Sequence, residues 1–505
     1  MKNFIKKITL ENVLCFYIIL CPILDIASFL FRNTFDTNIS ISTFVRPIIP
    51  IILAIYIFIK ANKKNKLILT GIALLYALYG IIHLYVMKGF ITGCSYGGVM
   101  QELQYIVNYT FLIFNLVVFY YVFIKKDWRK NSKKSSECDN EEAKEKIDEG
   151  SKSQTYKPRI EDSKSQICKL RIAILIMCAI YIVSIYIAIL TGTSSYTYPE
   201  EQIGYKGWIE SGNSLSAILC ISTFIILPLV KEKKYRIPAI IVLILVGVYL
   251  VALIGTRTGL IGFFLAVAVF IAVEVLFSKN KIAIVGFMIL AVAVITVGLV
   301  GSNTLKRRNQ MNESQYTIID EATGEVGNMT GDMLKIKNQI LAGTLEEGFM
   351  SEPQKQAVLD LYDFALENNL AGNDTRTQQL MYNIYLVFEQ KSATGIIFGN
   401  GFETNFREMI MENELASLLL NFGIVGFILY AGPFIGILIY GAIVCIKKLK
   451  AKEKIETGYL MSIAAMILIL GLSYLSGYIF FNSSLIAVIS CISIFIKCEN
   501  VAVKW

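Results

Sequence analysis

The chain has 505 residues, of which 55% are hydrophobic and 17% are charged. Soluble proteins carry roughly 25% charged residues, so this composition excludes an ordinary soluble protein and predicts an all-α polytopic membrane protein. The formal net charge of +9 would suit nucleic-acid binding, but the placement of lysine and arginine in the predicted loops explains it better. We therefore expect no nucleic-acid partner.

Apolar segments long enough to cross a bilayer recur along the chain, and we predict about twelve transmembrane helices. They are residues 13–31, 43–59, 67–87, 103–124, 171–191, 214–230, 237–253, 259–277, 282–301, 416–446, 458–476 and 481–497. The first follows Lys2, Lys6 and Lys7 as in a signal peptide. It is long for one and lacks a small-residue cleavage site, so we interpret it as a retained helix. Segment 416–446 is the longest, and we expect it to begin as an interfacial helix.

The positive-inside rule orients these helices. With the amino terminus inside, most of the 48 Lys and Arg residues fall in cytoplasmic segments, and residues 306–308 form the one basic cluster outside. Both termini are therefore predicted to be cytoplasmic. The predicted parts are transmembrane helices 1–4 in residues 1–124, a disordered charged cytoplasmic linker in 125–170, helices 5–9 in 171–301, a large helical extracellular loop in 302–411, and helices 10–12 in 412–505.

The two predicted soluble parts differ in character. The linker is charged and poor in aromatic residues, which is typical of a disordered tether beside anionic lipid head groups; a regulatory role is the alternative. The large loop contains two helix-like stretches, at 353–372 and 373–390. The second has Asp374 or Thr375 as its N-cap and an apolar stripe at helical spacing. We expect this loop to fold onto the membrane domain.

Polar residues gather beside the predicted outer ends of the helices. The candidates are Trp208, Glu210, Asn213, Arg257, Arg376, Glu412, Asn413 and Glu414. A carboxylate among arginines suits a site that deprotonates a hydroxyl and holds an anionic leaving group. The planar guanidinium also makes arginine a good partner for phosphate.

Each main candidate also has a simpler structural explanation. Arg257 could extend to lipid phosphates, and Glu412 could be a carboxylate favoured by the dipole of the following helix. Arg376 could pair with an acid of its own loop, and Asn213 could cap the sixth helix.

Other polar residues are interpreted as structural. We expect Asp25 and Arg46 to form an ion pair, because unpaired charges inside a helix bundle are costly. His83, the only histidine, is expected to serve packing, and Glu274 to reach the cytoplasm from an inner helix end. The ten cysteines have no paired spacing, so neither disulfides nor a cysteine metal site is expected. No phosphate-binding loop or metalloprotease motif is present, and no cofactor is predicted.

Several segments resemble those of bacterial O-antigen polymerases and O-antigen ligases. Residues 253–267 are similar to the segment that places the family's first arginine, here Arg257, at the start of a helix. Residues 373–406 are similar to the segment with a second arginine, here Arg376, an amphipathic helix and a Phe-Gly-x-Gly turn. Residues 412–430 resemble the family's His-Asn pair followed by an apolar helix with Gly-x-x-Gly.

The resemblance extends over roughly residues 195 to 440, since residues 204–219 are similar to the family stretch that ends in an asparagine, here Asn213, before a middle helix. There is one departure. The family's histidine falls on Glu412, while its asparagine is kept as Asn413. Either side chain accepts a proton, so the chemistry remains possible, and Glu414 is a rival for the role.

The resemblance implies a surface polysaccharide polymerase, an inverting and metal-independent glycosyltransferase that joins polyprenyl-diphosphate-linked oligosaccharide repeats on the outer face of the cell membrane. Its partners are the lipid-linked donor and acceptor and the bilayer, and could include a chain-length regulator and a flippase. Glu412 is implied to be the general base, with Arg257 and Arg376 stabilising the leaving diphosphate. The residues implied in substrate binding are Trp208, Asn213, Arg307, Arg308, Asn413 and Glu414.

Three alternatives stay open. A ligase would move finished glycan to an acceptor, and the motifs do not separate it from a polymerase. A transporter or flippase for lipid-linked oligosaccharide would be expected to carry polar or broken helices near mid-membrane, whereas the seventh to ninth helices are nearly uniform Ile, Val, Leu and Ala in their middles. A structural scaffold would leave Arg257 and the Glu412 cluster unexplained.

Overall fold

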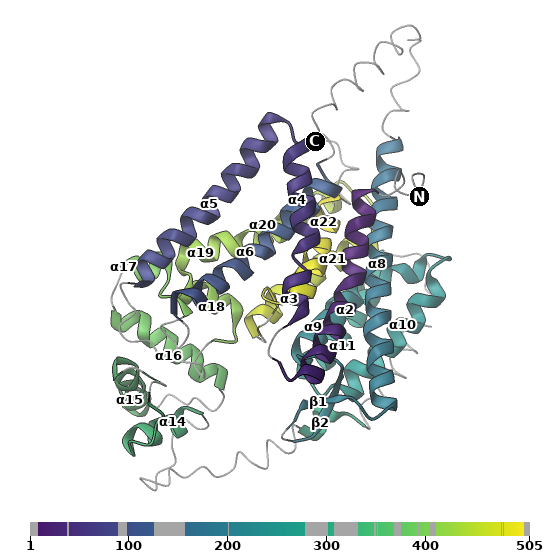
Figure 1. Cartoon of the computed structure of the whole chain (residues 1–505). Coiled ribbons are helices and arrows are strands. Elements are labelled where there is room, and N and C mark those ends of the chain that lie inside the picture. The colour runs from purple at the N-terminus through teal and green to yellow at the C-terminus, as the bar shows by residue number, and fades with distance from the viewer. Residues whose placement is uncertain are drawn as a thin grey trace, which may run out of the picture.

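Long apolar helices dominate the computed structural model (Figure 1). The structure describes residues 9–37, 40–88, 98–125, 157–199, 201–277, 301–307, 332–347, 350, 352–367, 375–390, 393–402, 411–475, 477 and 479–498. Most of the predicted linker, the predicted ninth membrane helix, Asp374 and Arg308 lie outside the described residues.

The first part of the chain is entirely helical where it is described. Its elements are α2 (Leu10–Phe35), α3 (Ile41–Val45), α4 (Ile48–Lys60), α5 (Lys63–Lys88), α6 (Gly98–Phe123) and α8 (Lys157–Leu190). A two-stranded antiparallel hairpin follows, which the sequence analysis did not predict. It consists of β1 (Ser195–Tyr198) and β2 (Ile203–Gly207), with Tyr196 opposite Tyr205.

Helices make up the rest of the described chain. They are α9 (Gly212–Ile226), η2 (Leu227–Lys231), α10 (Arg236–Val248), η3 (Tyr249–Leu253), α11 (Arg257–Phe277), α14 (Asp332–Leu341), α15 (Glu352–Glu367), α16 (Thr375–Gln390), α17 (Ala393–Phe398), α18 (Glu414–Asn421), α19 (Gly423–Tyr430), α20 (Gly432–Lys450), α21 (Thr457–Leu475) and α22 (Ser483–Cys498). Within the described residues, ten helices are long and apolar enough to cross a membrane. The predicted class, an all-α polytopic membrane protein, is confirmed.

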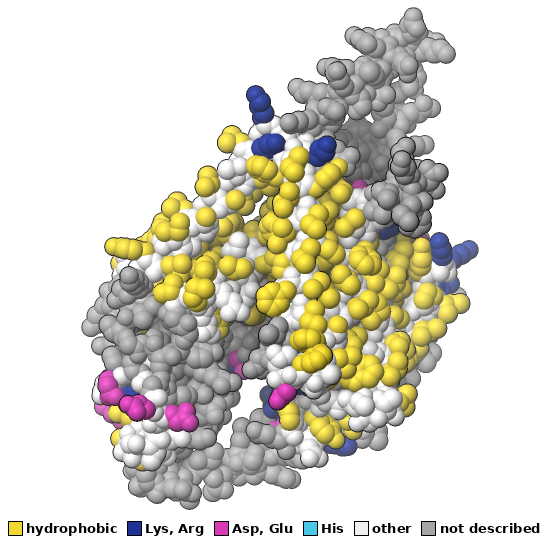
Figure 2. All heavy atoms as spheres, in the orientation of Figure 1, with side chains coloured by type: hydrophobic (Ala, Val, Ile, Leu, Met, Phe, Trp, Pro, Cys, Tyr) yellow, Lys and Arg dark blue, Asp and Glu magenta, His cyan; other side chains and the backbone are white. Residues whose placement is uncertain are grey.

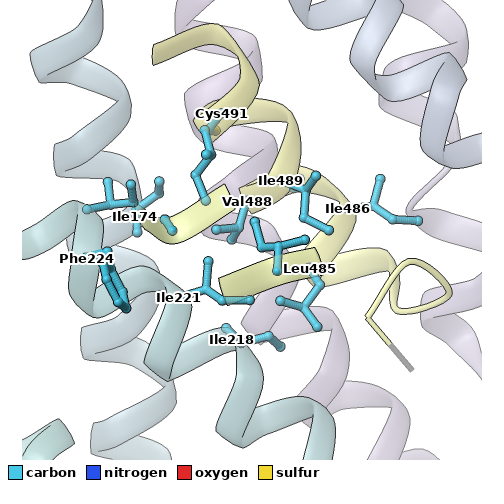
Figure 3. Packing of buried hydrophobic residues seen from close by; sticks show 14 of the residues in the cluster. Ile174, Ile218, Ile221, Phe224, Leu485, Ile486, Val488, Ile489 and Cys491 are labelled. Atoms are coloured by element: carbon cyan, nitrogen blue, oxygen red, sulfur yellow. The ribbon is translucent and has the colours of Figure 1, made fainter. Parts of the chain in front are cut away.

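Two apolar helices form the centre of the bundle. Every described residue of α9 but Asn213 is buried, and α22 is buried along almost its whole length. Figure 3 shows Ile218 and Ile221 of α9 beside Leu485 of α22, and Phe224 and Val488 belong to the same buried cluster. A helix that is apolar all round is stable only when neighbours surround it, and α22 contacts α6, α9, α20 and α21. Several serine and threonine hydroxyls of these two helices bond to carbonyls one turn earlier, for example Thr223 to Leu219 at 2.8 Å and Ser490 to Ile486 at 2.9 Å.

The predicted tenth helix, 416–446, is not continuous. It is divided into α18, α19 and α20, and only α20 is long enough to span a bilayer. Gly423 separates the first two pieces with a φ of +70°, and Pro433 lies in the first turn of α20. The positive φ at Gly423 ends α18, and Pro433 suits the first turn of α20.

The break at Gly423 is held by a second glycine turn. Gly399, with a φ of +88°, packs so closely that a Cβ atom on it would lie 2.0 Å from the Asn421 carbonyl oxygen. The buried His83 side chain fixes this turn from α5, since its ring nitrogens contact the Phe398 carbonyl at 2.6 Å and Glu102 at 2.8 Å. The expectation that His83 serves packing is confirmed, with a polar contact that the sequence did not reveal.

Helices α14, α15 and α16 form a small separate core. Its buried residues include Ile336, Val358, Leu361 and Tyr382. Helix α16 contacts α17 and α18, so this unit packs against the bundle as expected for the large loop. The two predicted loop helices correspond to α15 and α16, and Gly372, the predicted end of the first, lies outside the described residues.

The prediction that Glu274 reaches the cytoplasm is wrong. Its residue is only 6% exposed, and its carboxylate accepts hydrogen bonds from Lys231 at 2.8 Å and Thr457 at 2.6 Å. The three residues tie α11, η2 and α21 together, because a carboxylate between helices needs partners inside the protein.

We predict that Gly399→Ala destabilises the protein. The left-handed conformation alone costs an L-residue about 1–2 kcal/mol, and the overlap with Asn421 adds to this. Thermal unfolding in detergent should show a clear decrease in Tm. Gly436→Ala is the matched control, because a Cβ there meets nothing within 4 Å. Equal Tm values for the two variants would contradict this account of the turn.

Candidate functional site

A polar cavity of about 620 Å³ lies where α2, α3, α6, the β-hairpin, the start of α9 and the start of α22 meet. Its lining includes four charged side chains, Asp25, Arg32, Arg46 and Glu210, together with polar ones such as Tyr198 and Asn213. They come from segments that are far apart in the sequence, so the fold is needed to bring them together. A cavity of this size, with convergent polar groups, is typical of a ligand site.

The ion pair expected between Asp25 and Arg46 is confirmed, and it lies in the wall of this cavity. One Asp25 oxygen accepts from Arg46, and the other accepts from Tyr181 and, at 2.9 Å, from Ser484. Arg46 also donates to the Cys21 carbonyl at 3.3 Å. The pair therefore fixes one wall of the cavity by joining α2, α8 and α22 to the α3–α4 junction.

Arg32 is a cavity residue that the sequence analysis did not select. Its Nη1 lies 2.8 Å from Glu210 Oε1, which connects the end of α2 to the loop before α9. Its position was visible in the sequence, because a basic residue at a predicted outer helix end opposes the positive-inside bias.

Three arginines gather around Tyr198 at the rim. The Arg307 guanidinium carbon lies 3.5 Å from the centre of the Tyr198 ring. Burial raises the pKa of Tyr198, while the positive charges of Arg307, Arg376 and Arg257 oppose this increase. The negative charge of Glu201, whose Oε1 lies 3.8 Å from Arg307 Nε, raises the pKa further. The three positive charges act on one hydroxyl, so the structure brings together three of the predicted site arginines. Arg257 is exposed and has no ion-pair partner among the described residues.

The structure also joins Arg376 to Glu412. Arg376 Nε donates to Glu412 Oε2 at 2.7 Å, and its Nη1 donates to the Leu475 carbonyl at 2.9 Å. The Glu412 amide in turn donates to Gln379 Oε1 at 3.1 Å. Both side chains of the pair are about one third exposed, so they remain accessible to a ligand.

Glu414, two residues later, has a different environment. Its residue is 4% exposed, and its carboxylate accepts from the amides of Ile479, Phe480 and Phe481 at 2.7, 2.9 and 3.1 Å. Burial raises the pKa of Glu414 to about 7, although the three amides act in the opposite direction. Glu414 thus holds the loop before α22 in place.

Asn413 has a side-chain oxygen without a partner in the described chain, and Asn213 lines the polar cavity. Asn413 occupies the N-cap position of α18 without making a capping bond, and its Oδ1 is buried with no partner among the described residues. The cap of α9 is Ser211, which accepts a hydrogen bond from the Ser214 amide at 3.3 Å. The expectation of an Asn213 cap is therefore wrong.

Trp208 does not line the cavity. Its indole nitrogen donates to Thr193 Oγ1 at 3.0 Å, so its polar atom faces the end of α8. Of the predicted site residues, Glu210 and Asn213 line the cavity. The charges of Arg257, Arg307 and Arg376 act on Tyr198 in its wall, and Glu412 is bound to Arg376.

We predict that Glu414→Ala lowers the free energy of unfolding by at least about 3 kcal/mol, because each of three buried amides that loses its acceptor costs roughly 1–3 kcal/mol. Glu414→Gln keeps one acceptor oxygen and should cost less. Chemical or thermal unfolding in detergent measures the difference. Glu412→Gln is the matched control on the accessible carboxylate. A stability loss for Glu412→Gln as large as that for Glu414→Ala would refute these assignments.

Comparison with known proteins gives one match to a family model. The model described as "O-antigen ligase like membrane protein" matches residues 158–497. No curated protein and no solved structure gives a significant match. The matched range includes the hairpin, α9, the arginines of the rim and Glu412, but not α2 to α6.

Proposed function

The chain belongs to the O-antigen ligase-like family of membrane proteins, and on this basis we propose that it is a surface polysaccharide polymerase. The family supports a membrane enzyme that processes glycans. The proposed enzyme is an inverting, metal-independent glycosyltransferase. It joins polyprenyl-diphosphate-linked oligosaccharide repeats on the outer face of the cell membrane, and both of its termini are cytoplasmic.

The Arg376–Glu412 pair is the observation that carries this proposal, because the charge of Arg376 also acts on Tyr198 in the wall of the polar cavity. In the proposed step, Glu412 takes the proton from the acceptor hydroxyl as its oxygen bonds to the anomeric carbon. The bond from that carbon to the diphosphate oxygen breaks, and the diphosphate leaves with the electron pair. A single displacement from the opposite face inverts the anomeric carbon.

The arginines suit the leaving group. Arg257, Arg307 and Arg376 concentrate positive charge near Tyr198, where a diphosphate gains charge as the bond breaks. Arg376 can exchange its carboxylate for a phosphate, since the guanidinium fork binds either group. Release of Glu412 by the arriving donor would free the base at the moment it is needed.

The asparagines suit the sugar. The buried Asn413 Oδ1 has no partner in the described chain and is next to the base, so it is placed to accept from an acceptor hydroxyl. Asn213 can serve a sugar hydroxyl from the cavity wall. Because Glu414 is bonded to three backbone amides, we assign the base to Glu412 and give Glu414 a supporting role.

A ligase would use the same residues and differ in its acceptor. The length of the products separates the two enzymes, because only a polymerase builds a ladder of longer glycans on a lipid-linked acceptor. Donor and acceptor are the essential partners, and a flippase and a chain-length regulator are compatible with them.

We predict that the purified protein in nanodiscs converts a polyprenyl-diphosphate-linked repeat from its own host into a ladder of longer glycans, with or without chelator. Arg257→Ala, Arg376→Ala and Glu412→Gln should each reduce the rate by on the order of 100-fold or more. Glu352→Gln is the matched control, since the Glu352 carboxylate is 83% exposed on α15.

The products distinguish the alternatives. Transfer of one intact glycan to a non-lipid acceptor would identify a ligase. Movement of the lipid-linked repeat across a vesicle membrane without new glycosidic bonds would identify a transporter. Full activity of Glu412→Gln would refute the assignment of Glu412 as the base and leave the proposed reaction unchanged.

A further inference from the structure

An apolar groove of about 970 Å³ lies between α4, α5 and α6. Its walls are mostly aliphatic and aromatic, for example Ile51, Phe58, Ile72, Leu103 and Val107. The volume is at the upper end of ligand pockets, which are roughly 300–1,000 Å³. Figure 2 shows hydrophobic side chains covering the face formed by α4 and α5. The groove therefore lies on a face suited to lipid.

The groove and the polar cavity adjoin. Thr43, Gln104, Asn108 and Ser483 line both. Gln104 and Asn108 lie one turn apart on α6, so that helix has an apolar wall on one side of these residues and a polar wall on the other. A molecule with a long apolar chain and a polar head would have its boundary at these four side chains.

The polar side has unused capacity for an anion. Arg46 is 5% exposed, and its Nε is buried without a partner in the described chain. The Arg32 Nε is also buried and unpartnered, although its Nη1 binds Glu210. A buried donor that lacks an acceptor is costly, and a phosphate satisfies guanidinium groups well. The unpaired donors thus indicate an anionic head group.

We propose that the groove binds the polyisoprenoid chain of a lipid-linked substrate, with the phosphate group of that lipid beside Arg46 and Arg32. The identity of the chain rests on the proposed function, which requires polyprenyl-linked glycans. The site lies mainly on α2 to α6, outside residues 158–497 that match the family model. It is separate from Arg257, Arg307 and Arg376, none of which lines the polar cavity, although Tyr198 beside them does.

The test uses a photoreactive polyprenyl phosphate in phosphatidylcholine nanodiscs that contain the full-length protein. Labelled peptides should map to α4, α5 and α6. Excess unlabelled polyprenyl diphosphate should reduce the labelling, whereas inorganic diphosphate and phosphatidylglycerol should not. Competition by phosphatidylglycerol, or labelling spread evenly over α10 and α11, would overturn the proposal.

A pair of neighbouring substitutions on α5 tests the groove. Ala77→Trp should reduce labelling about tenfold or more, because the indole occupies space that the chain would fill. Leu78→Trp is the matched control, since Leu78 is 56% exposed and does not line the groove. Equal labelling of the two variants would contradict binding in the groove.

Two further variants test the head-group end. Arg32→Ala should reduce labelling about tenfold, the effect of losing one charged hydrogen bond. The double variant Asp25→Asn with Arg46→Gln removes both charges but keeps hydrogen-bonding groups, and its Tm shows whether it folds. Unchanged labelling in Arg32→Ala and in the folded double variant would place the phosphate elsewhere.

Glu412→Gln separates this inference from the proposed function. It should abolish glycan transfer and leave labelling unchanged, because Glu412 acts on the acceptor hydroxyl and lines neither the groove nor the polar cavity. Transfer without labelling of α4 to α6 would refute the lipid site and leave the enzyme assignment intact. Labelling of α4 to α6 without any glycan transfer by the unmodified protein would support the lipid site and refute the enzyme assignment.

Discussion

A carboxylate between membrane helices has to find its partners inside the protein, and Asp25 finds three. Arg46, Tyr181 and Ser484 all donate to it, so α2, α8 and α22 and the α3–α4 junction are joined at one point. Removing one partner from such a group costs far more than the bond itself contributes, because the others are left around an uncompensated charge. The polar cavity exists because these segments cannot separate there. Everything proposed for substrate binding depends on that fixed wall.

In segment 412–414, three consecutive residues have different environments. Glu412 turns toward Arg376, Asn413 keeps an unsatisfied oxygen, and Glu414 is buried against backbone amides of the loop before α22. The same two loops are in contact through Gly477, where a Cβ would lie 1.8 Å from the Glu412 carbonyl oxygen. The buried carboxylate of Glu414 thus helps to fix the position of the accessible carboxylate of Glu412.

The helices could be predicted from the sequence because lipid imposes a length and a composition on every spanning segment. The family could be predicted from the order of its short motifs. The uniformity that lipid imposes hides which helix is central. Nothing in the hydropathy of α9 or α22 separates them from α5, which lies at the edge of the bundle with only 17% of its apolar window buried. The break at Gly423 depends on contacts with Ile397 and Gly399, whereas the hairpin at Tyr198 is a local pairing of two short strands that hydropathy does not mark. Arg32 and Arg46 were readable as charged residues, but their common cavity appears only in three dimensions.

The length of α22 determines how deep the cavity lies. Its 16 residues measure about 24 Å, whereas the hydrocarbon layer of a bilayer is about 30 Å thick. If Lys497 lies at one surface, Ser483 and the loop before it lie below the opposite surface, and the cavity floor is at the depth of the lipid chains. Bulk water is scarce at that depth, which in the proposed reaction would protect an activated sugar from hydrolysis while it waits for a hydroxyl acceptor.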